Sequence, residues 1–394
     1  MTDDSTYSPP ASLSRVQRFA LFAGVAGLAL CGLGYAADHH QFARSYLMAF
    51  VFWSGVALGC LALLMISHLS GGAWGVVSRR VFEAASRTLP LLAILFVPVA
   101  LGLQDLYLWA QPEAVAADPI LQHKAPYLND GFFLARTLLY FVIWSAMAWF
   151  LSAWSRRQDE GSDTGLRMQR LSGGGLLVYA ITVFFMSVDW IMSLDPHWFS
   201  TVYGMLFMVG QGLSALAFTI AVVVLLARTE PFRRVVGAAH LHDLGKLMFA
   251  FVMLWAYLTF SQFLIVWSAN LPEEIPWYLA RMEGGWGWVG LLLIFGHFFL
   301  PFFILLNRDV KRDRRLILTV AVFILAVRFV DLFWLIGPPH GAHGVAVHWL
   351  DVVAPLGLGG LFVAVFLWQL ASRPLLPVGD PYLQEALEHG RSHH

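Results

Sequence analysis

Ten apolar runs divide this sequence, and their lengths limit what the chain can fold into more than any other feature. Each run holds at least about 20 residues, enough for a helix to cross the roughly 30 Å apolar core of a bilayer at about 1.5 Å per residue. The sequence therefore predicts an all-α, polytopic membrane protein with ten transmembrane helices. The predicted spans are residues 16–37, 45–67, 89–109, 131–153, 169–190, 200–226, 246–269, 286–306, 316–336 and 348–370.

The composition excludes a water-soluble domain and a nucleic-acid-binding protein. Hydrophobic residues form 58% of the 394 residues, charged residues form 13%, and the mean hydropathy is +0.66. Such values are typical of proteins that lie largely within a bilayer. The formal net charge is zero, so bulk charge offers no attraction for nucleic acid. The first apolar run is too long for a signal peptide and lacks a small-residue cleavage pattern, so we expect it to be retained.

The cysteine and histidine content argues against a redox centre in this chain. Cys31 and Cys60 lie in separate predicted spans, and the sequence has no CxxC or CxxCH motif. Ligation of an iron–sulfur cluster or attachment of a c-type haem by this chain alone is therefore not expected. His297 is the only histidine well inside a predicted span, which disfavours a haem held between two histidines. We expect no covalently bound cofactor.

Basic residues alternate between successive connections and predict the topology. The connections of one set hold most of the arginines and lysines, whereas the opposite set contains only Arg44, Lys124 and Arg281. By the positive-inside rule, both termini are expected in the cytoplasm. The outward connections are then the segments near residues 38–44, 110–130, 191–199, 270–285 and 337–347.

A weak internal repeat predicts two related halves. The string Gln104–Trp109 matches Gln262–Trp267 at its Gln, Leu and Trp positions, and Val188-Asp189-Trp190 resembles Val330-Asp331-Leu332. Helices 2–5 and 6–9 would then form two four-helix bundles related by a pseudo-two-fold axis near the membrane normal, with two flanking helices. The predicted segments are a cytoplasmic N-terminal tail (1–15), a first flanking helix with an outer loop (16–44), the two bundles (45–190 and 191–347), a last flanking helix (348–370) and a cytoplasmic C-terminal tail (371–394).

Polar side chains are expected at a common depth in the outer third of the membrane. Ionisable groups in hydrocarbon are costly, so they face the bundle interior or water and usually pair with one another. Arg328 and Asp331 are three residues apart on one helix, which makes them candidate partners. The predicted outer layer consists of Gln104, Asp105, Arg136, Asp189, Gln262, Arg328 and Asp331.

Two interpretations of this layer are open. The groups are either buried ion pairs that fix helix packing, or parts of a proton pathway or a quinone-headgroup site. A quinol releases protons on oxidation, and a nearby carboxylate or imidazole must accept them. Asp105, Asp189 and Asp331 have the right chemistry. His297 and Tyr257 lie near the predicted midplane and are either proton-relay members or packing residues.

The predicted helix ends carry two further candidate groups. His242, Asp243 and Lys246 precede the seventh span, where they are candidates for a cytoplasmic proton entrance. Asp243 is expected to cap that helix, and without further ligands nearby the HxHD string predicts no metal site. Glu273 and Glu274 follow the same span on the outer side, where they suit proton exit or docking of a partner.

The segment around the seventh span resembles a known family. The run from His242-Asp-Leu-Gly-Lys to Trp255, then Phe260-Ser-Gln-Phe263 and Asn270-Leu-Pro-Glu-Glu-Ile-Pro-Trp-Tyr278, is similar to ActF, the family of smaller NrfD-like integral membrane subunits of bacterial alternative complex III. The resemblance implies a multi-pass subunit of a quinol-oxidising electron-transfer complex in the bacterial cytoplasmic (inner) membrane. It also implies that this subunit contributes a proton pathway or an accessory quinone site and is not catalytic alone.

The resemblance further implies the partners. These are a larger NrfD-like membrane subunit that holds the main quinol site, an iron–sulfur subunit, c-type cytochrome subunits and a terminal oxidase, besides the lipid bilayer. Haem c and iron–sulfur clusters would reside only on those partners, and quinone or quinol is the one ligand to expect here. Two other functions remain open: a stand-alone transporter or channel, and a purely structural membrane anchor.

Overall fold

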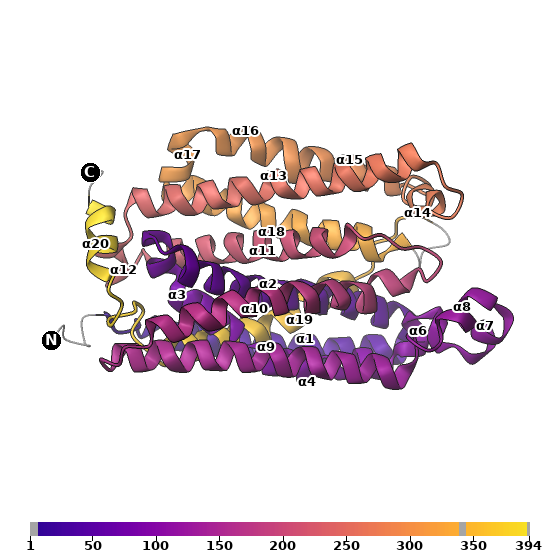
Figure 1. Cartoon of the computed structure of the whole chain (residues 1–394), viewed down its shortest axis with the longest axis horizontal. Helices are drawn as coiled ribbons and strands as arrows, with labels where there is room; N and C mark the ends of the chain where they lie inside the picture. Colours follow the sequence, from indigo (N-terminus) through magenta and orange to yellow (C-terminus); the bar gives the residue numbers. More distant parts are fainter. Residues whose placement is uncertain (1–6, 339–343, 392–394) are drawn as a thin grey trace.

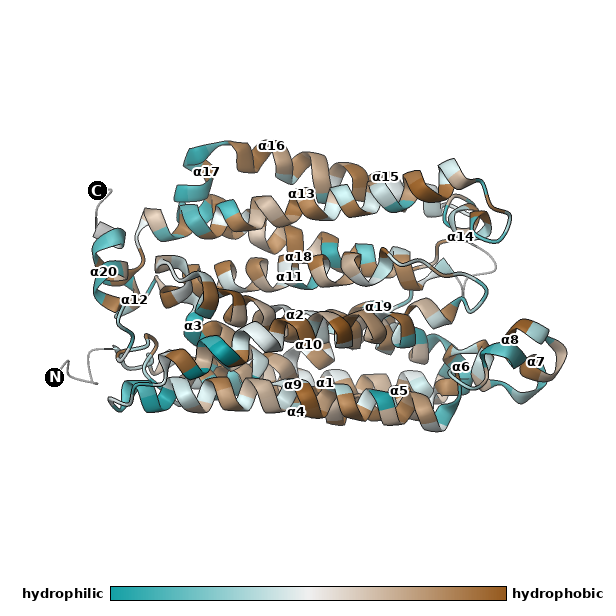
Figure 2. Ribbon diagram, in the orientation of Figure 1, coloured by the Kyte–Doolittle hydropathy of each residue, from teal (hydrophilic) through white to brown (hydrophobic). Residues whose placement is uncertain are grey.

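The computed structural model describes residues 7–338 and 344–391 and is all-α over these ranges. Ten helical segments in the described part are long and apolar enough to cross a membrane, as the apolar runs predicted. They lie roughly along the long axis of the molecule (Figure 1), with hydrophobic residues along their middles and hydrophilic residues gathered towards both ends (Figure 2). The chain is therefore a polytopic membrane protein.

The spans include several that are broken into shorter helices. They are α1 (Ser12–Ala37), α2 (His39–Ser70), a third span made of α3 (Ala73–Ser86), α4 (Leu89–Leu95) and α5 (Val97–Leu101), α9 (Asp130–Asp159), α10 (Gly165–Trp190), α11 (Tyr203–Leu226), α13 (Ala238–Ala269), an eighth span made of α15 (Trp286–Leu292), the π-helix η4 (Leu293–Phe299) and α16 (Leu300–Leu306), α18 (Arg314–Ile336) and α19 (Leu350–Ala371).

Short helices lie at the two ends of the bundle. The end that holds the start of α1 is called the terminal end, and the other is called the loop end (Figure 1). The terminal end carries α12 (Phe232–Val235), α17 (Arg308–Arg312) and α20 (Leu383–Arg391). The loop end carries α6 (Leu103–Leu106), η2 (Leu108–Ala110), α7 (Pro112–Ala117), α8 (Pro119–Lys124), η3 (Met192–Leu194) and α14 (Ile275–Ala280).

Two helices form the centre of the bundle. In the most apolar 18-residue window of each, 89% of the α2 residues and 78% of the α11 residues are buried. The corresponding figures for α13 and for the eighth span are only 22%, so most of their apolar side chains face outward. In a bilayer such side chains contact lipid at no cost, which explains how so much apolar surface can remain uncovered by protein.

The two halves have similar neighbours. Helix α2 packs against α3, α10 and α11, and helix α11 packs against α13, α18 and α2. These are equivalent pairs if helices 2–5 correspond to helices 6–9, and they fit the predicted repeat, whose axis stays a prediction. The Gln-Trp strings do not match in structure, because Gln104 is exposed beyond the third span whereas Gln262 is buried within α13.

The third span differs from its prediction. It runs from Ala73 to Leu101 instead of from 89 to 109, because α3 continues the span on its N-terminal side. The residues around Arg79 and Arg80 are therefore buried helix, not an exposed basic loop. The predicted outer loop at 38–44 is also wrong. Only Asp38 separates α1 from α2, and its carboxylate accepts a hydrogen bond from the backbone N–H of Gln41 at 2.9 Å.

Glycines allow α1 and α19 to pack in close contact. A Cβ at Gly27 would lie 2.5 Å from the Cα of Gly357, and a Cβ at Gly24 would lie 2.6 Å from the backbone nitrogen of Leu361. Small residues permit this approach in membranes, where van der Waals packing between helices supplies much of the association energy. The flanking helices therefore hold each other as an antiparallel pair beside α2.

We expect Gly27→Val to lower the free energy of unfolding by roughly 1–3 kcal/mol, because the new side chain collides with backbone. Thermal unfolding in detergent measures the effect. Gly32→Val is the matched control. Gly32 lies on the same helix, and a Cβ there would meet nothing within 4 Å. Equal destabilisation by the two substitutions would contradict the packing argument.

Candidate functional site

The first buried polar cluster joins α9 to α10. The Arg136 guanidinium donates two hydrogen bonds to Asp189, from Nε to Oδ2 at 3.0 Å and from Nη2 to Oδ1 at 2.9 Å. The Tyr140 hydroxyl donates to Asp189 Oδ2 at 2.8 Å, and Arg136 stacks over the Tyr127 ring. Asp189 is fully buried. With three donors on its two oxygens, this carboxylate is held as a structural ion pair.

The second buried polar cluster lies between α13, η4 and α18. Arg328 forms an ion pair with Asp331 along α18, as their spacing predicted, and Trp255 Nε1 donates to Asp331 Oδ2 at 3.3 Å. The guanidinium of Arg328 fits because Gly210 has no side chain, since a Cβ there would lie 2.2 Å from Arg328 Nη2. Unlike Asp189, Asp331 receives no guanidinium from a neighbouring helix in the described part of the chain.

His297 lies behind Trp255 in the same cluster. Its ring centroid is 3.9 Å from that of Trp255, and neither ring nitrogen has a hydrogen-bond partner among the described residues. The histidine is 1% exposed and belongs to the π-helical turn η4. Such turns widen a helix locally and are frequent at functional sites. The structure therefore brings His297, Arg328 and Asp331 together, with Trp255 as the residue that sequence reasoning missed.

A cavity of about 560 Å³ lies between α13, α14, the eighth span and α18, and Asp331 belongs to its lining. Phe260, Leu291 and Ile294 at its rim are 62%, 43% and 48% exposed. The cavity therefore opens sideways on the surface that faces the bilayer. Most of its remaining lining is apolar or aromatic: Trp255, Ala256, Phe263, Tyr278, Met282, Gly287, Gly290, Leu293, Phe298, Phe299 and Trp334.

Few polar groups face this cavity besides Asp331. Arg281 lies just after α14, donates to the backbone oxygens of Trp277 and Leu335 at 2.9 and 2.7 Å, and stacks on the Trp277 ring. Burial lowers the pKa of Arg281 to about 10, so it stays a cation at neutral pH. Trp334 Nε1 and Thr259 Oγ1 have no hydrogen-bond partner among the described residues. The cavity thus combines an anion, a cation and two free polar groups.

Two predicted members of the outer layer lie outside the spans, and the midplane candidate Tyr257 faces outward. Gln104 and Asp105 belong to α6, beyond the third span, because that span ends at Leu101. The side chain of Tyr257 is 66% exposed on the outside of α13, so it cannot extend a buried chain from His297. Gln262 is buried, and its Oε1 accepts from Ser200 Oγ at 3.4 Å. Of the seven predicted members of the layer, Gln104 and Asp105 therefore lie outside the membrane spans.

The candidate entrance at the terminal end is a contact between α13 and α20. His389 lies 2.9 Å from Asp243, Lys246 pairs with the same carboxylate, and the ring of His240 bonds the Ala386 carbonyl. Asp243 lies inside α13 instead of capping it, because α13 already begins at Ala238. His242 is half-buried on the same turn. At the loop end, Glu273 is exposed in the turn between α13 and α14, and Glu274 is half-buried there.

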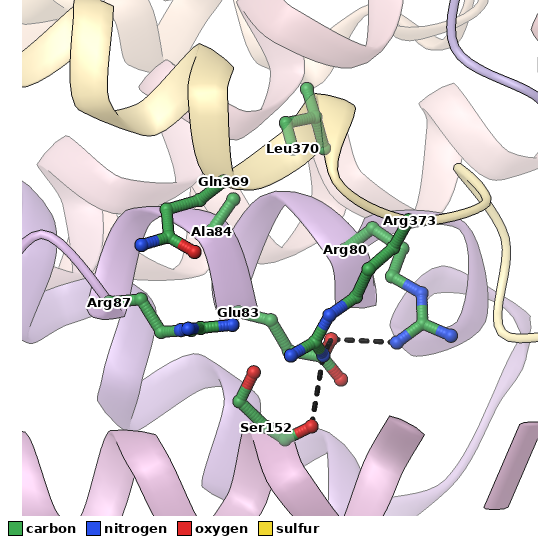
Figure 3. Close-up of a pocket in the computed structure, with 8 residues that line it drawn as sticks. All are labelled: Arg80, Glu83, Ala84, Arg87, Ser152, Gln369, Leu370 and Arg373. Atoms are coloured by element: carbon green, nitrogen blue, oxygen red, sulfur yellow. Dashed lines mark hydrogen bonds and ion pairs between the residues drawn. The ribbon is translucent and has the colours of Figure 1, made fainter. Parts of the chain in front are cut away.

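A buried charge cluster at the terminal end was missed by sequence reasoning (Figure 3). Arg80 Nη1 lies 2.7 Å from Glu83 Oε2, Arg80 also pairs with Asp159, and Arg373 lies 3.4 Å from the same Glu83 oxygen. These groups connect α3, α9 and the end of α19. The sequence does contain one indication of this cluster: Arg80 and Glu83 are three residues apart, a spacing at which opposite charges on a helix can pair.

Comparison with protein-family models and with curated proteins finds no match to this chain. The arguments for its function therefore come from the site. A carboxylate whose oxygens all accept hydrogen bonds from neighbouring side chains holds helices together. A carboxylate that borders a membrane-facing cavity can exchange a proton with a bound molecule.

Proposed function

We propose that this chain is a membrane subunit of a quinol-oxidising electron-transfer complex, of the alternative complex III type that its sequence resembles. The observation that carries the proposal is the membrane-facing cavity with the buried Asp331 in its lining. In this proposal the cavity is a quinone site of this subunit, in addition to the main quinol site that the resemblance places on the larger partner.

The size and lining of the cavity fit a quinone. Its volume of about 560 Å³ lies within the roughly 300–1,000 Å³ of small-molecule sites, which are mostly apolar with a few placed polar groups. Quinones are dissolved in the bilayer, so a lateral opening between α13 and the eighth span suits their entry. The oxygens of a quinone ring accept hydrogen bonds, and Arg281 and Trp334 supply donors.

Asp331 supplies the proton chemistry. Oxidation of a quinol breaks two O–H bonds and releases two protons and two electrons. The carboxylate of Asp331 accepts one proton at a time and passes it towards the loop end. Once the proton has left, Arg328 stabilises the carboxylate anion of Asp331. The electrons go to iron–sulfur or haem centres on partner subunits. Cys31 and Cys60, which are buried on separate helices, do not supply the set of thiolates that an iron–sulfur cluster needs.

Purification in mild detergent tests the proposal at the level of the complex. We expect haem c and iron–sulfur absorbance, and extractable quinone, to co-purify with the tagged chain. A colourless protein that purifies alone and transports a solute in vesicles would contradict the proposal and support a transporter. A complex in which no quinone site maps to this chain would support the structural anchor.

We expect Gly290→Phe to reduce quinone binding to this cavity by at least tenfold, because the ring fills space beside Trp334. A Cβ at Gly290 lies 3.5 Å from Trp334 Nε1, an ordinary contact, so the backbone tolerates the substitution. Cross-linking with an azidoquinone, followed by mapping of the labelled peptides, measures the effect. Gly290→Ala is the control and should keep at least half of the labelling. Equal labelling of the two variants would exclude the cavity as the site.

A further inference from the structure

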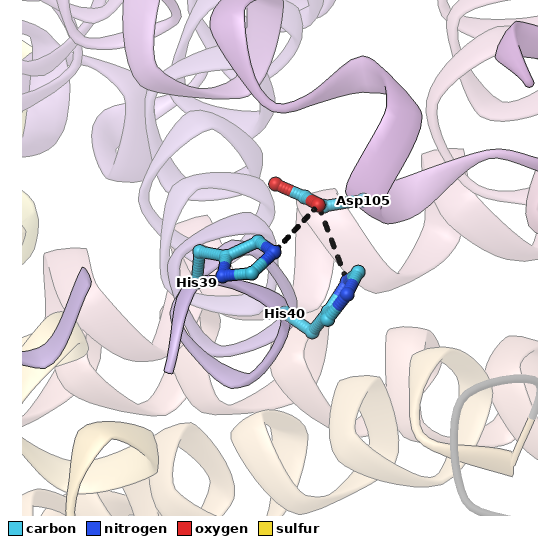
Figure 4. Close-up of side chains that lie close together, drawn as sticks. All are labelled: His39, His40 and Asp105. Atoms are coloured by element: carbon cyan, nitrogen blue, oxygen red, sulfur yellow. Dashed lines mark ion pairs between the residues drawn. The ribbon is translucent and has the colours of Figure 1, made fainter. Parts of the chain in front are cut away.

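Two histidines and an aspartate converge at the loop end, outside the site described above (Figure 4). His39 and His40 begin α2, and Asp105 belongs to α6, the segment that follows the third span. Asp105 Oδ1 lies 3.5 Å from His39 Nε2 and 3.2 Å from His40 Nδ1. One ligand atom from each residue lies within 4.8 Å of the other two. The two imidazole side chains are more than half exposed, and solvent reaches all three groups.

We propose that His39, His40 and Asp105 bind a zinc ion. Zinc prefers tetrahedral sites, and bonds of about 2.0–2.1 Å place neighbouring ligand atoms roughly 3.4 Å apart. The two histidine-to-aspartate distances already match this separation. The ligand nitrogens of the two imidazoles lie within 4.8 Å of each other, and the ring centroids are 4.2 Å apart. Two imidazoles and one carboxylate are a ligand set typical of zinc, and the fourth position is open to water or to a side chain of a partner.

The position of the site explains what a bound ion would do. His39 and His40 follow the single residue, Asp38, that separates α1 from α2. Asp105 lies in a short helix of four residues, α6, which already packs against α2 and has Leu103 and Leu106 buried. An ion on all three residues would tie this segment to the rigid start of α2. It would thereby fix the loop-end surface from which α7 and α8 project (Figure 1). This inference does not depend on quinone binding.

Calorimetric titration of the purified chain with zinc chloride tests the proposal. Every variant carries His393→Ser and His394→Ser, because a histidine tail also binds metals. We expect one equivalent of zinc to bind, and Co²⁺ in its place to give the intense visible absorption of a tetrahedral site. His40→Ala and Asp105→Asn should each weaken zinc binding by about 100-fold or more. Loss of an outer-shell partner alone costs up to about 100-fold, and loss of a direct ligand should cost at least as much.

His197→Ala is the matched control. His197 Nε2 lies 2.6 Å from Asp118 Oδ2 at the same end of the molecule, and this pair belongs to no cluster of three ligands among the described residues. The control should bind zinc as tightly as the parent. Zinc should also raise the unfolding temperature of the parent and of His197→Ala, but not that of His40→Ala. Absence of a one-to-one titration, or an unchanged affinity in His40→Ala, would overturn the zinc site.

Discussion

Replacement of Glu83 by glutamine is expected to lower the free energy of unfolding by about 3–5 kcal/mol, the cost of removing one partner from a buried ion pair. Glu83 is 2% exposed and accepts from Arg80, itself 3% exposed, while Arg373 lies 3.4 Å from the same oxygen. The amide would leave Arg373 facing a neutral group and would leave Arg80 with Asp159 as its remaining carboxylate partner. Thermal unfolding in detergent, with α20 accessibility to protease as a second readout, measures the loss.

Glu385→Gln is the control for charge removal alone, because Glu385 is exposed on α20. It should change stability by less than about 0.5 kcal/mol. The double variant Glu83→Gln, Arg373→Gln should recover part of the loss, since Arg373 forms its ion pair with Glu83 and is the cation that the single substitution leaves unmatched. If Glu83→Gln unfolds at the same temperature as Glu385→Gln, the terminal-end cluster does not stabilise the fold.

The apolar runs predicted ten helices because the bilayer imposes one length on every span. The apolar runs misplaced the third span, because a hydropathy scale counts every charged residue as polar even where its charge is neutralised by a neighbour. In α3 the charges of Arg80 and Glu83 cancel, so a polar stretch is buried and helical. Arg80 also pairs with Asp159, which lies 79 residues away. The periodicity of a sequence carries no information about charge neutralisation between residues so far apart.

The candidate site shows the same division between local and distant contacts. The Arg328–Asp331 pair was predicted from a spacing of three residues on one helix. The pairing of Arg136 with Asp189, 53 residues apart, was not, although both were expected in the outer layer, facing the bundle interior or water. The cavity is bounded by four separate elements, and no spacing within one helix specifies it. Depth along a span predicts which residues are buried, but helix rotation decides which of them meet. The outward-facing Tyr257 is an example.

The two halves of the chain thus use similar residues differently. Asp189 accepts hydrogen bonds from a guanidinium on another helix and from Tyr140, and it does not line the cavity of about 560 Å³. Asp331 is paired along its own helix and borders the quinone-sized cavity. If the halves arose by duplication, one copy kept a structural ion pair, and the other copy is open to a ligand.

Asp331→Asn is therefore expected to weaken quinol binding to the cavity by about 10- to 100-fold, because a hydrogen bond to a charged group contributes about 1.5–3 kcal/mol and each 1.4 kcal/mol is tenfold in affinity. The neutral amide can neither attract the quinol hydroxyl as strongly nor accept its proton. Competition of a short-chain quinol with azidoquinone labelling, in the assembled complex, measures the affinity. Quinol-dependent proton release should fall in the same variant.

Asp189→Asn separates this effect from a general loss of structure. It breaks a buried Arg–Asp pair of the same kind, so it should lower the unfolding temperature at least as much as Asp331→Asn does. Since Asp189 does not border the cavity, its substitution should leave quinol affinity unchanged in the protein that stays folded. Equal losses of quinol binding in the two variants would mean that Asp331, like Asp189, only holds helices together, and the quinone site would have to lie on a partner.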